Sequence, residues 1–139
     1  MIIKEKDLAS GKIDDFKNKL ICGETLDALK KMPDNSVSLI ITSPSYFLGK
    51  SYEKDHVFNE YLDEHKIILK ECKRVLKDKG KFVVVLAANK VKDWHRQKEV
   101  NSWSKEKWTE LFQEEKFNVK LHEVVEEKQN LYFFELNFV

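Results

Sequence analysis

The hydrophobic pattern is clearest over Val57–Leu76, where apolar side chains recur at intervals of three and four positions. This spacing predicts an amphipathic α-helix whose buried face includes His65 and Cys72. Shorter segments of the same period predict a helix over Thr25–Met32 and another over Lys105–Lys116. Ser104 is the expected N-cap of the last helix. The side chains expected on its buried face are Trp108, Leu111 and Phe112.

Apolar or alternating segments predict the strands. In chain order these are Lys19–Cys22, Ser36–Thr42, Lys81–Ala88, Phe117–Val125 and Asn130–Phe138. Lys81–Ala88 is apolar on both faces, as in a central parallel strand, and the last two segments predict a hairpin around Glu126–Gln129. Strands that alternate with helices before a hairpin predict an α/β fold. We expect an open, mostly parallel sheet with one antiparallel strand at the end.

Two polar segments are predicted to lack regular structure. Lys77–Gly80 is predicted to be a turn, in which Gly80 would supply a left-handed residue. Asn89–Trp103 is predicted to be a long loop. The overlapping stretch Lys90–Lys107 holds six basic and three acidic residues. That excess of positive charge fits either a weak phosphate-binding site or a solvated surface.

Composition narrows the class of protein. The 139 residues are 42% apolar and 35% charged, which predicts a single folded domain over residues 1–139. There is no apolar run long enough to span a membrane and no signal-peptide pattern, so we expect a cytoplasmic protein. Cys22, Cys72, His95 and His122 lack the spacing of metal ligands, and no metal site is expected. The net charge of +1 neither favours nor excludes nucleic acid.

The glycines exclude two common phosphate-binding motifs. Gly11, Gly23, Gly49 and Gly80 lie too far apart to form G-x-G-x-x-G or G-x-x-x-x-G-K-[ST]. The sequence therefore has no recognisable glycine-rich cradle for a dinucleotide or a triphosphate.

The segment Ser43–Tyr46 is the strongest candidate for chemistry. It follows a predicted buried strand, and ligands of open α/β sheets bind beyond the carboxyl ends of the strands. The Ser43 hydroxyl and the Pro44 carbonyl can accept hydrogen bonds from an amino group, and Pro44 stiffens the turn. Tyr46 offers a flat face on which a planar ring can stack. Taken alone, such a Ser-Pro-x-Tyr segment is usually only a turn.

A longer pattern surrounds this segment. Residues 23–46, G-E-x-L-x-x-L-x-x-M-P-D-x-S-V-x-L-I-I-T-S-P-S-Y, resemble the amino-group DNA methyltransferases, whose hallmark is (Ser/Asp/Asn)-Pro-Pro-(Tyr/Phe/Trp). The likeness continues through Leu48–Glu53, Glu71–Lys77 and Gly80–Val84, and covers about Ile21–Ala88. The resemblance implies methylation of cytosine N4 or adenine N6 in DNA, with S-adenosylmethionine as the cofactor. It also implies a partial Rossmann-like methyltransferase sheet.

The resemblance implies roles for six residues. Ser43 and the Pro44 carbonyl would hold the target amino nitrogen, Ser45 would complete the catalytic loop, and Tyr46 would stack on a flipped-out base. Glu24 and Thr42 would contact the cofactor, although the residues alone favour Glu24 as a first-turn helix acid that interacts with the helix dipole. No Pro-Cys pair occurs, which argues against the cytosine-C5 enzymes and their thiolate nucleophile.

The chain departs from the family pattern in two ways. Ser45 replaces the second proline of the tetrapeptide, and the glycine-rich F-x-G-x-G motif for the methionine end of the cofactor does not occur. In a permuted branch of the family that motif follows the catalytic half. We therefore expect the catalytic half of a truncated or split enzyme, which alone binds S-adenosylmethionine weakly or not at all. Its expected partners are DNA and either a second chain with the glycine-rich motif or another copy of itself.

Two alternatives remain open at this level. The chain could be a non-catalytic methyltransferase remnant or an interaction subunit. Related tetrapeptides also serve the methylation of RNA bases and protein amides, so the substrate could belong to either class.

Overall fold

The structure is a computed structural model that describes residues 1–44, 58–87, 90–93, 98–101, 104–125 and 130–138. Its strands are β1 (Ile2–Lys4), β2 (Leu20–Cys22), β3 (Val37–Thr42), β4 (Leu76–Ala87), β5 (Lys90–Asp93), β6 (Lys98–Asn101), β7 (Phe117–Val125) and β8 (Asn130–Phe138). Its helices are α1 (Thr25–Lys31), α2 (Phe58–Val75) and α3 (Lys105–Glu114), with short 3-10 turns η1 (Glu5–Asp7) and η2 (Ile13–Asp15). The three predicted helices and the five predicted strands are confirmed, and most of their ends lie within a few residues of the predicted ends.

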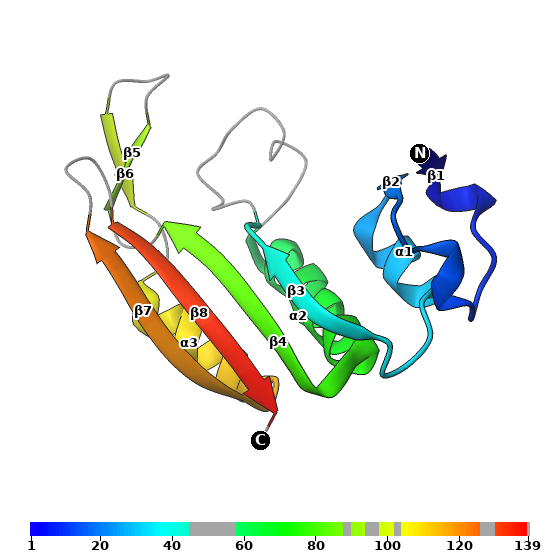
Figure 1. Cartoon of the computed structure of the whole chain (residues 1–139). Coiled ribbons are helices and arrows are strands. Elements are labelled where there is room, and N and C mark those ends of the chain that lie inside the picture. Colours follow the sequence, from blue (N-terminus) through cyan, green and yellow to red (C-terminus); the bar gives the residue numbers. More distant parts are fainter. Residues whose placement is uncertain (45–57, 88–89, 94–97, 102–103, 126–129, 139) are drawn as a thin grey trace.

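A four-stranded sheet of order β3-β4-β8-β7 forms the centre of the fold (Figure 1). Strands β3 and β4 are parallel, and β8 is antiparallel to both of its neighbours. The predicted α/β class with a mixed sheet and a C-terminal hairpin is confirmed. The antiparallel strand is not at the edge of the sheet, because β8 inserts between β4 and β7.

Helices α2 and α3 cover one face of this sheet (Figure 1). Strand alternation directs Phe82 and Phe134 toward the helices, where Phe112 of α3 meets the Phe134 ring edge-on at 5.2 Å. The three apolar residues predicted for the buried side of α3 are confirmed, since each is at most 4% exposed: Trp108, Leu111 and Phe112. Ser104 caps this helix as expected and accepts a hydrogen bond from the Lys107 amide.

The N-terminal elements form a smaller unit. Strands β1 and β2 make a parallel two-stranded sheet that lies apart from the larger one (Figure 1). Helix α1 connects this smaller unit to the rest of the fold, because it packs against α2. Gly23, after β2, allows a close approach: a Cβ at this position would collide with the side chain of Glu5. Gly23 is therefore a packing residue. The sequence predicted β2, which ends just before it, but not the partner strand β1.

Two predicted irregular segments contain strands instead. Lys77–Gly80 continues β4, and Gly80 is not left-handed; it is needed because a Cβ there would lie 2.7 Å from Cδ1 of Leu76. Within Asn89–Trp103, β5 and β6 pair in an antiparallel ladder. Their short and mostly polar sequences do not indicate this pairing, which backbone hydrogen bonds form. Most of the charged side chains of Lys90–Lys107 lie outside those that the structure describes. His95 and the predicted turn Glu126–Gln129 also lie outside the described residues.

Among the described residues, no helix is long and apolar enough to cross a membrane.

Candidate functional site

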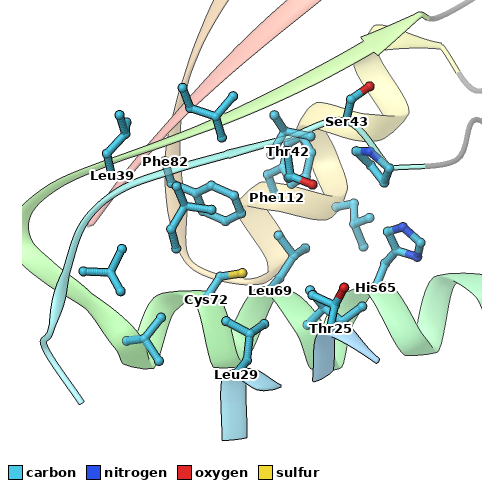
Figure 2. Close-up of a pocket in the computed structure, with 18 of the residues that line it drawn as sticks. Thr25, Leu29, Leu39, Thr42, Ser43, His65, Leu69, Cys72, Phe82 and Phe112 are labelled. Carbon is cyan, nitrogen blue, oxygen red and sulfur yellow. The ribbon is translucent and has the colours of Figure 1, made fainter. Parts of the chain in front are cut away.

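A cavity of about 650 Å³ lies along β3, between this strand and helices α1, α2 and α3 (Figure 2). Most of its lining is apolar and belongs to the core, for example Leu69 and Phe112. Four uncharged polar side chains line it as well: Thr25, Thr42, Ser43 and His65. Figure 2 shows these four toward one end of the cavity and Cys72 and Leu39 toward the other. Mostly apolar walls with a few convergent polar groups are typical of small-molecule sites.

The predicted catalytic turn begins at the polar end. Thr42 is the last residue of β3 and pairs with Val84, which directs its side chain toward the helices. Ser43 and Pro44 follow it and line the cavity, with Ser43 exposed and Pro44 half-buried. The structure thus brings these three predicted site residues together at the carboxyl end of a strand. Ser45 and Tyr46 lie outside the described residues.

The predicted acidic residue stands beside the same end of the cavity. Glu24 is the exposed residue that precedes α1, and its side chain makes no capping hydrogen bond. The next residue, Thr25, lines the cavity together with Ser43. The structure therefore brings the start of α1 and the end of β3 to one site, whereas the cofactor contact of Glu24 stays a prediction.

His65 is a site residue that the sequence did not identify. Its helical position predicts a core-facing side chain, and it is half-buried on α2, at the edge of the cavity. Its Nδ1 lies 2.7 Å from the carbonyl oxygen of Tyr61, one turn earlier. Burial lowers the pKa of His65 below the ordinary value of 6.5, which favours the neutral ring at pH 7. The apolar period of α2 could indicate only that His65 faces inward. It could not indicate that the end of β3 lines the same cavity, because this depends on how the helix packs against the sheet.

Cys72 lines the apolar end of the cavity and is not a nucleophile. Its side chain is 5% exposed, and burial raises the pKa of the thiol to about 12. A thiol with such a pKa is protonated at neutral pH and unreactive. This confirms the prediction that Cys72 belongs to the buried face of its helix.

Arg74 fixes α1 and the start of β3 against α2. Its guanidinium donates to the carbonyl oxygens of Leu29 and Met32, to the carboxylate of Asp34, and from two nitrogens to the carboxylate of Glu71. All five N–H donors of the side chain are therefore used. We call this set of hydrogen bonds the Arg74 clamp. Because it holds the residues just before β3 and the last turn of α1 together, it helps to position the strand relative to that helix.

The cavity continues around the free edge of β3. Leu39 and Ile41 point to one face of the strand and Ile40 and Thr42 to the other, yet all four line the cavity. Leu39 and Ile41 are 55% and 65% exposed. Within the described part of the chain, β3 pairs only with β4 and has an unpaired edge.

The described glycines do not form a cradle at this site. Gly23 packs on Glu5, Gly80 packs on Leu76, and Gly11 lies in a turn with a φ of +83°. None of these three glycines is among the residues that line the cavity. In the described ranges, moreover, no group of three His, Cys, Asp or Glu side chains is placed to hold a metal ion.

Comparison of the sequence with protein families identifies one match. The family described as DNA methylase, N6/N4 type, matches residues 37–139, well over half of the chain. The type II methyltransferase M.HpaI of Haemophilus parainfluenzae is 42% identical over 71 residues, which cover 49% of this chain and 23% of that protein. The DNA adenine methyltransferase YhdJ of Escherichia coli is 36% identical over 72 residues, 48% of this chain and 24% of that protein.

Solved structures share the fold. The PvuII DNA methyltransferase, described as cytosine-N4-specific, superposes with a TM-score of 0.58 at 20% identity and covers 84% of this chain and 48% of its own. A SAM-dependent methyltransferase from Aquifex aeolicus gives a TM-score of 0.56 at 18% identity, over 86% of this chain and 55% of its own. The chain thus spans about a quarter of the relatives that it matches in sequence and about half of these structures.

Proposed function

Because the chain belongs to the amino-group DNA methyltransferase family, we propose that it supplies the catalytic strand and base-binding turn of an S-adenosylmethionine-dependent enzyme that methylates cytosine N4 or adenine N6 in DNA. One observation carries the proposal: Ser43 and Pro44 follow the carboxyl end of β3 and border a largely apolar cavity. This is where open α/β folds bind their ligands. We also propose a cytoplasmic location, which is where bacteria such as the sources of these relatives keep their DNA.

The proposed chemistry depends on positioning. The Ser43 hydroxyl and the Pro44 carbonyl accept hydrogen bonds from the target amino group, which fixes the direction of the nitrogen lone pair. Tyr46 stacks on the extruded base, and Ser45 completes the turn. When bound, S-adenosylmethionine supplies an electrophilic methyl group. The residues of the turn form no covalent bond to the base.

The described residues fit one end of this cofactor better than the other. Thr42 and Thr25 at the polar end of the cavity, with Glu24 beside them, offer groups that can contact an adenosine moiety. The described glycines line no part of the cavity, so they offer no close backbone approach for the methionine end. We propose that residues 1–139 act as one domain and that a glycine-rich segment from outside these residues binds the methionine end.

The free edge of β3 supports the need for a further segment. A parallel strand pair is normally buried on both faces, but Leu39 and Ile41 are largely exposed, and no strand of the described residues pairs with the edge beside them. A further strand on this edge would cover both features. Whether that strand belongs to a longer polypeptide, a second chain or another copy decides the form of the enzyme but not the role of Ser43.

The proposal is tested by methyl transfer from radiolabelled S-adenosylmethionine to DNA, with the chain assembled with the polypeptide that completes it. Ser43→Ala and Tyr46→Ala should each abolish transfer and leave the circular dichroism spectrum unchanged. The matched control is Ser38→Ala, an exposed serine on the same strand, which should retain full activity.

Other outcomes separate the alternatives. Full activity in both Ser43→Ala and Tyr46→Ala would contradict the proposed roles. Transfer to RNA or to a protein amide instead of DNA would replace the substrate. A folded, assembled complex that methylates none of the three substrates would favour a non-catalytic subunit.

A further inference from the structure

We infer that His65 is a binding residue that accepts a hydrogen bond from the exocyclic amino group of a nitrogen heterocycle at the polar end of the cavity. The ligand class follows from the proposed function and the inference rests on it. The role of His65 itself rests on the hydrogen bonding of its ring and on its place in the cavity.

The hydrogen bond to Tyr61 fixes the tautomer of His65. Nδ1 lies 2.7 Å from the Tyr61 carbonyl oxygen, and a carbonyl oxygen only accepts hydrogen bonds. Nδ1 must therefore carry the hydrogen. In the neutral ring, Nε2 then has no hydrogen and presents a lone pair. Burial favours this neutral form, because it lowers the pKa of His65.

Neighbouring rings hold the imidazole in this orientation. The Tyr61 ring lies 4.0 Å from it, centre to centre and tilted by 38°, and Trp108 approaches edge-on at 6.5 Å. Since Nδ1 is bonded back to the helix backbone, Nε2 is the ring nitrogen farther from the helix. His65 thus provides a preoriented acceptor at the wall of the cavity.

The surrounding groups suit an aminated heterocycle. Ser43 and Thr42 stand at the same end of the cavity as His65, as Figure 2 shows, and their hydroxyl groups can donate as well as accept. The remaining lining is mostly apolar and can contact a planar ring. An amino group donates hydrogen bonds, so a fixed acceptor such as Nε2 favours its binding.

Two sources could provide this amino group: the adenine of the cofactor, or the target base, in which case Nε2 takes one of its two hydrogens and either the Ser43 hydroxyl or the Pro44 carbonyl takes the other. The experiment is nitrogen-15 NMR of the histidine side chains in the 139-residue protein, since Nε2 shifts upfield when it accepts a hydrogen bond. The probes are S-adenosylhomocysteine, deoxyadenosine and deoxycytidine at concentrations on the order of millimolar, where weak binding is detectable. The ribosides of purine and pyrimidin-2-one, which lack the amino group, are the matched controls.

We expect the free protein to show His65 with a hydrogen on Nδ1 only. At least one aminated probe should shift Nε2 of His65, whereas the ribosides without an amino group should not. A shift with deoxycytidine assigns the site to the target base, and a shift with S-adenosylhomocysteine but neither deoxynucleoside assigns it to the cofactor. His122, exposed on β7, is the internal control and should not respond.

A variant pair adds an affinity measurement. His65→Phe should weaken binding of the active probe roughly tenfold, the cost of one lost hydrogen bond, and His65→Gln should recover part of it. The inference is wrong if no aminated probe shifts Nε2, or if probes with and without the amino group shift it equally. These NMR and affinity measurements do not depend on methyl transfer. If transfer depends on Ser43 but Nε2 of His65 does not shift with any probe, this inference is overturned and the proposed function is not.

Discussion

The two cysteines show how burial separates residues of the same type. Cys22 is exposed at the end of β2, whereas Cys72 is 5% exposed on α2 and the pKa of its thiol is raised to about 12. The sequence indicated that Cys72 faces the core because it shares the apolar stripe of α2. The size of the pKa change could not be predicted, since it depends on the sheet and helices that surround the thiol.

We predict that a thiol-alkylating reagent labels Cys22 rapidly at pH 8 and labels Cys72 only after unfolding in urea. Mass spectrometry of peptides from the labelled protein measures both sites. The raised pKa also has a consequence for stability: the folded state keeps Cys72 protonated while the unfolded state ionises near its ordinary pKa of 9.0. Stability should therefore fall as pH rises above about 9. Rapid labelling of Cys72 in the folded protein would contradict the buried site.

The elements of the fold differ in how far the sequence predicts them. Helix α2 was predictable because its apolar period extends over many residues, and β3 because it is a short apolar run before a proline turn. Strands β5 and β6 were missed, since each has only four residues, mostly charged, with a single valine. The position of β8 inside the sheet was also beyond local reasoning, because pairing with β4 joins segments far apart in the chain.

Arg74 illustrates a connection between elements that no local pattern predicts. It joins the end of α1 and the turn before β3 to α2 through three hydrogen bonds, and two more to Glu71 on the same helix hold its guanidinium in place. Arg74→Lys keeps the charge but has three donors without the planar fork. We expect the free energy of unfolding to fall by about 2 kcal/mol, measured by urea denaturation.

The matched control for Arg74 is Lys81→Ala. Lys81 forms an ion pair with Glu135 on the open face of the sheet, where its side chain is 59% exposed, so its loss should change stability far less. Equal stability of Arg74→Lys and the wild type would show that the clamp contributes nothing to the packing of α1.

At the scale of the whole molecule, the site is composite. The carboxyl end of β3 and the start of α1 border one cavity, but in the part of the chain that the structure describes one edge of β3 has no partner strand and the glycines lie elsewhere. The position of the proposed catalytic turn at the end of β3 was predictable, because Ser43 and Pro44 directly follow an apolar strand in the sequence. His65 could not be identified, because its approach to that turn depends on how α2 packs against β3.

This composite site predicts weak cofactor binding. Titration of the purified 139-residue chain with S-adenosylmethionine by calorimetry should give a dissociation constant weaker than micromolar, since no described backbone segment cradles the methionine end. Binding should tighten when the segment that completes the sheet is added. Micromolar binding to the monomeric chain would mean that a complete cofactor site lies within these residues.

The central claim, amino-group methylation of DNA through Ser43, is tested most directly by identifying the methylated nucleoside. DNA incubated with S-adenosylmethionine and the assembled protein is digested to nucleosides and analysed by mass spectrometry. We predict N4-methylcytosine or N6-methyladenine with the wild-type chain and neither with Ser43→Ala. A methyl group found only at carbon 5 of cytosine, or the same product from Ser43→Ala at the wild-type rate, would contradict the account.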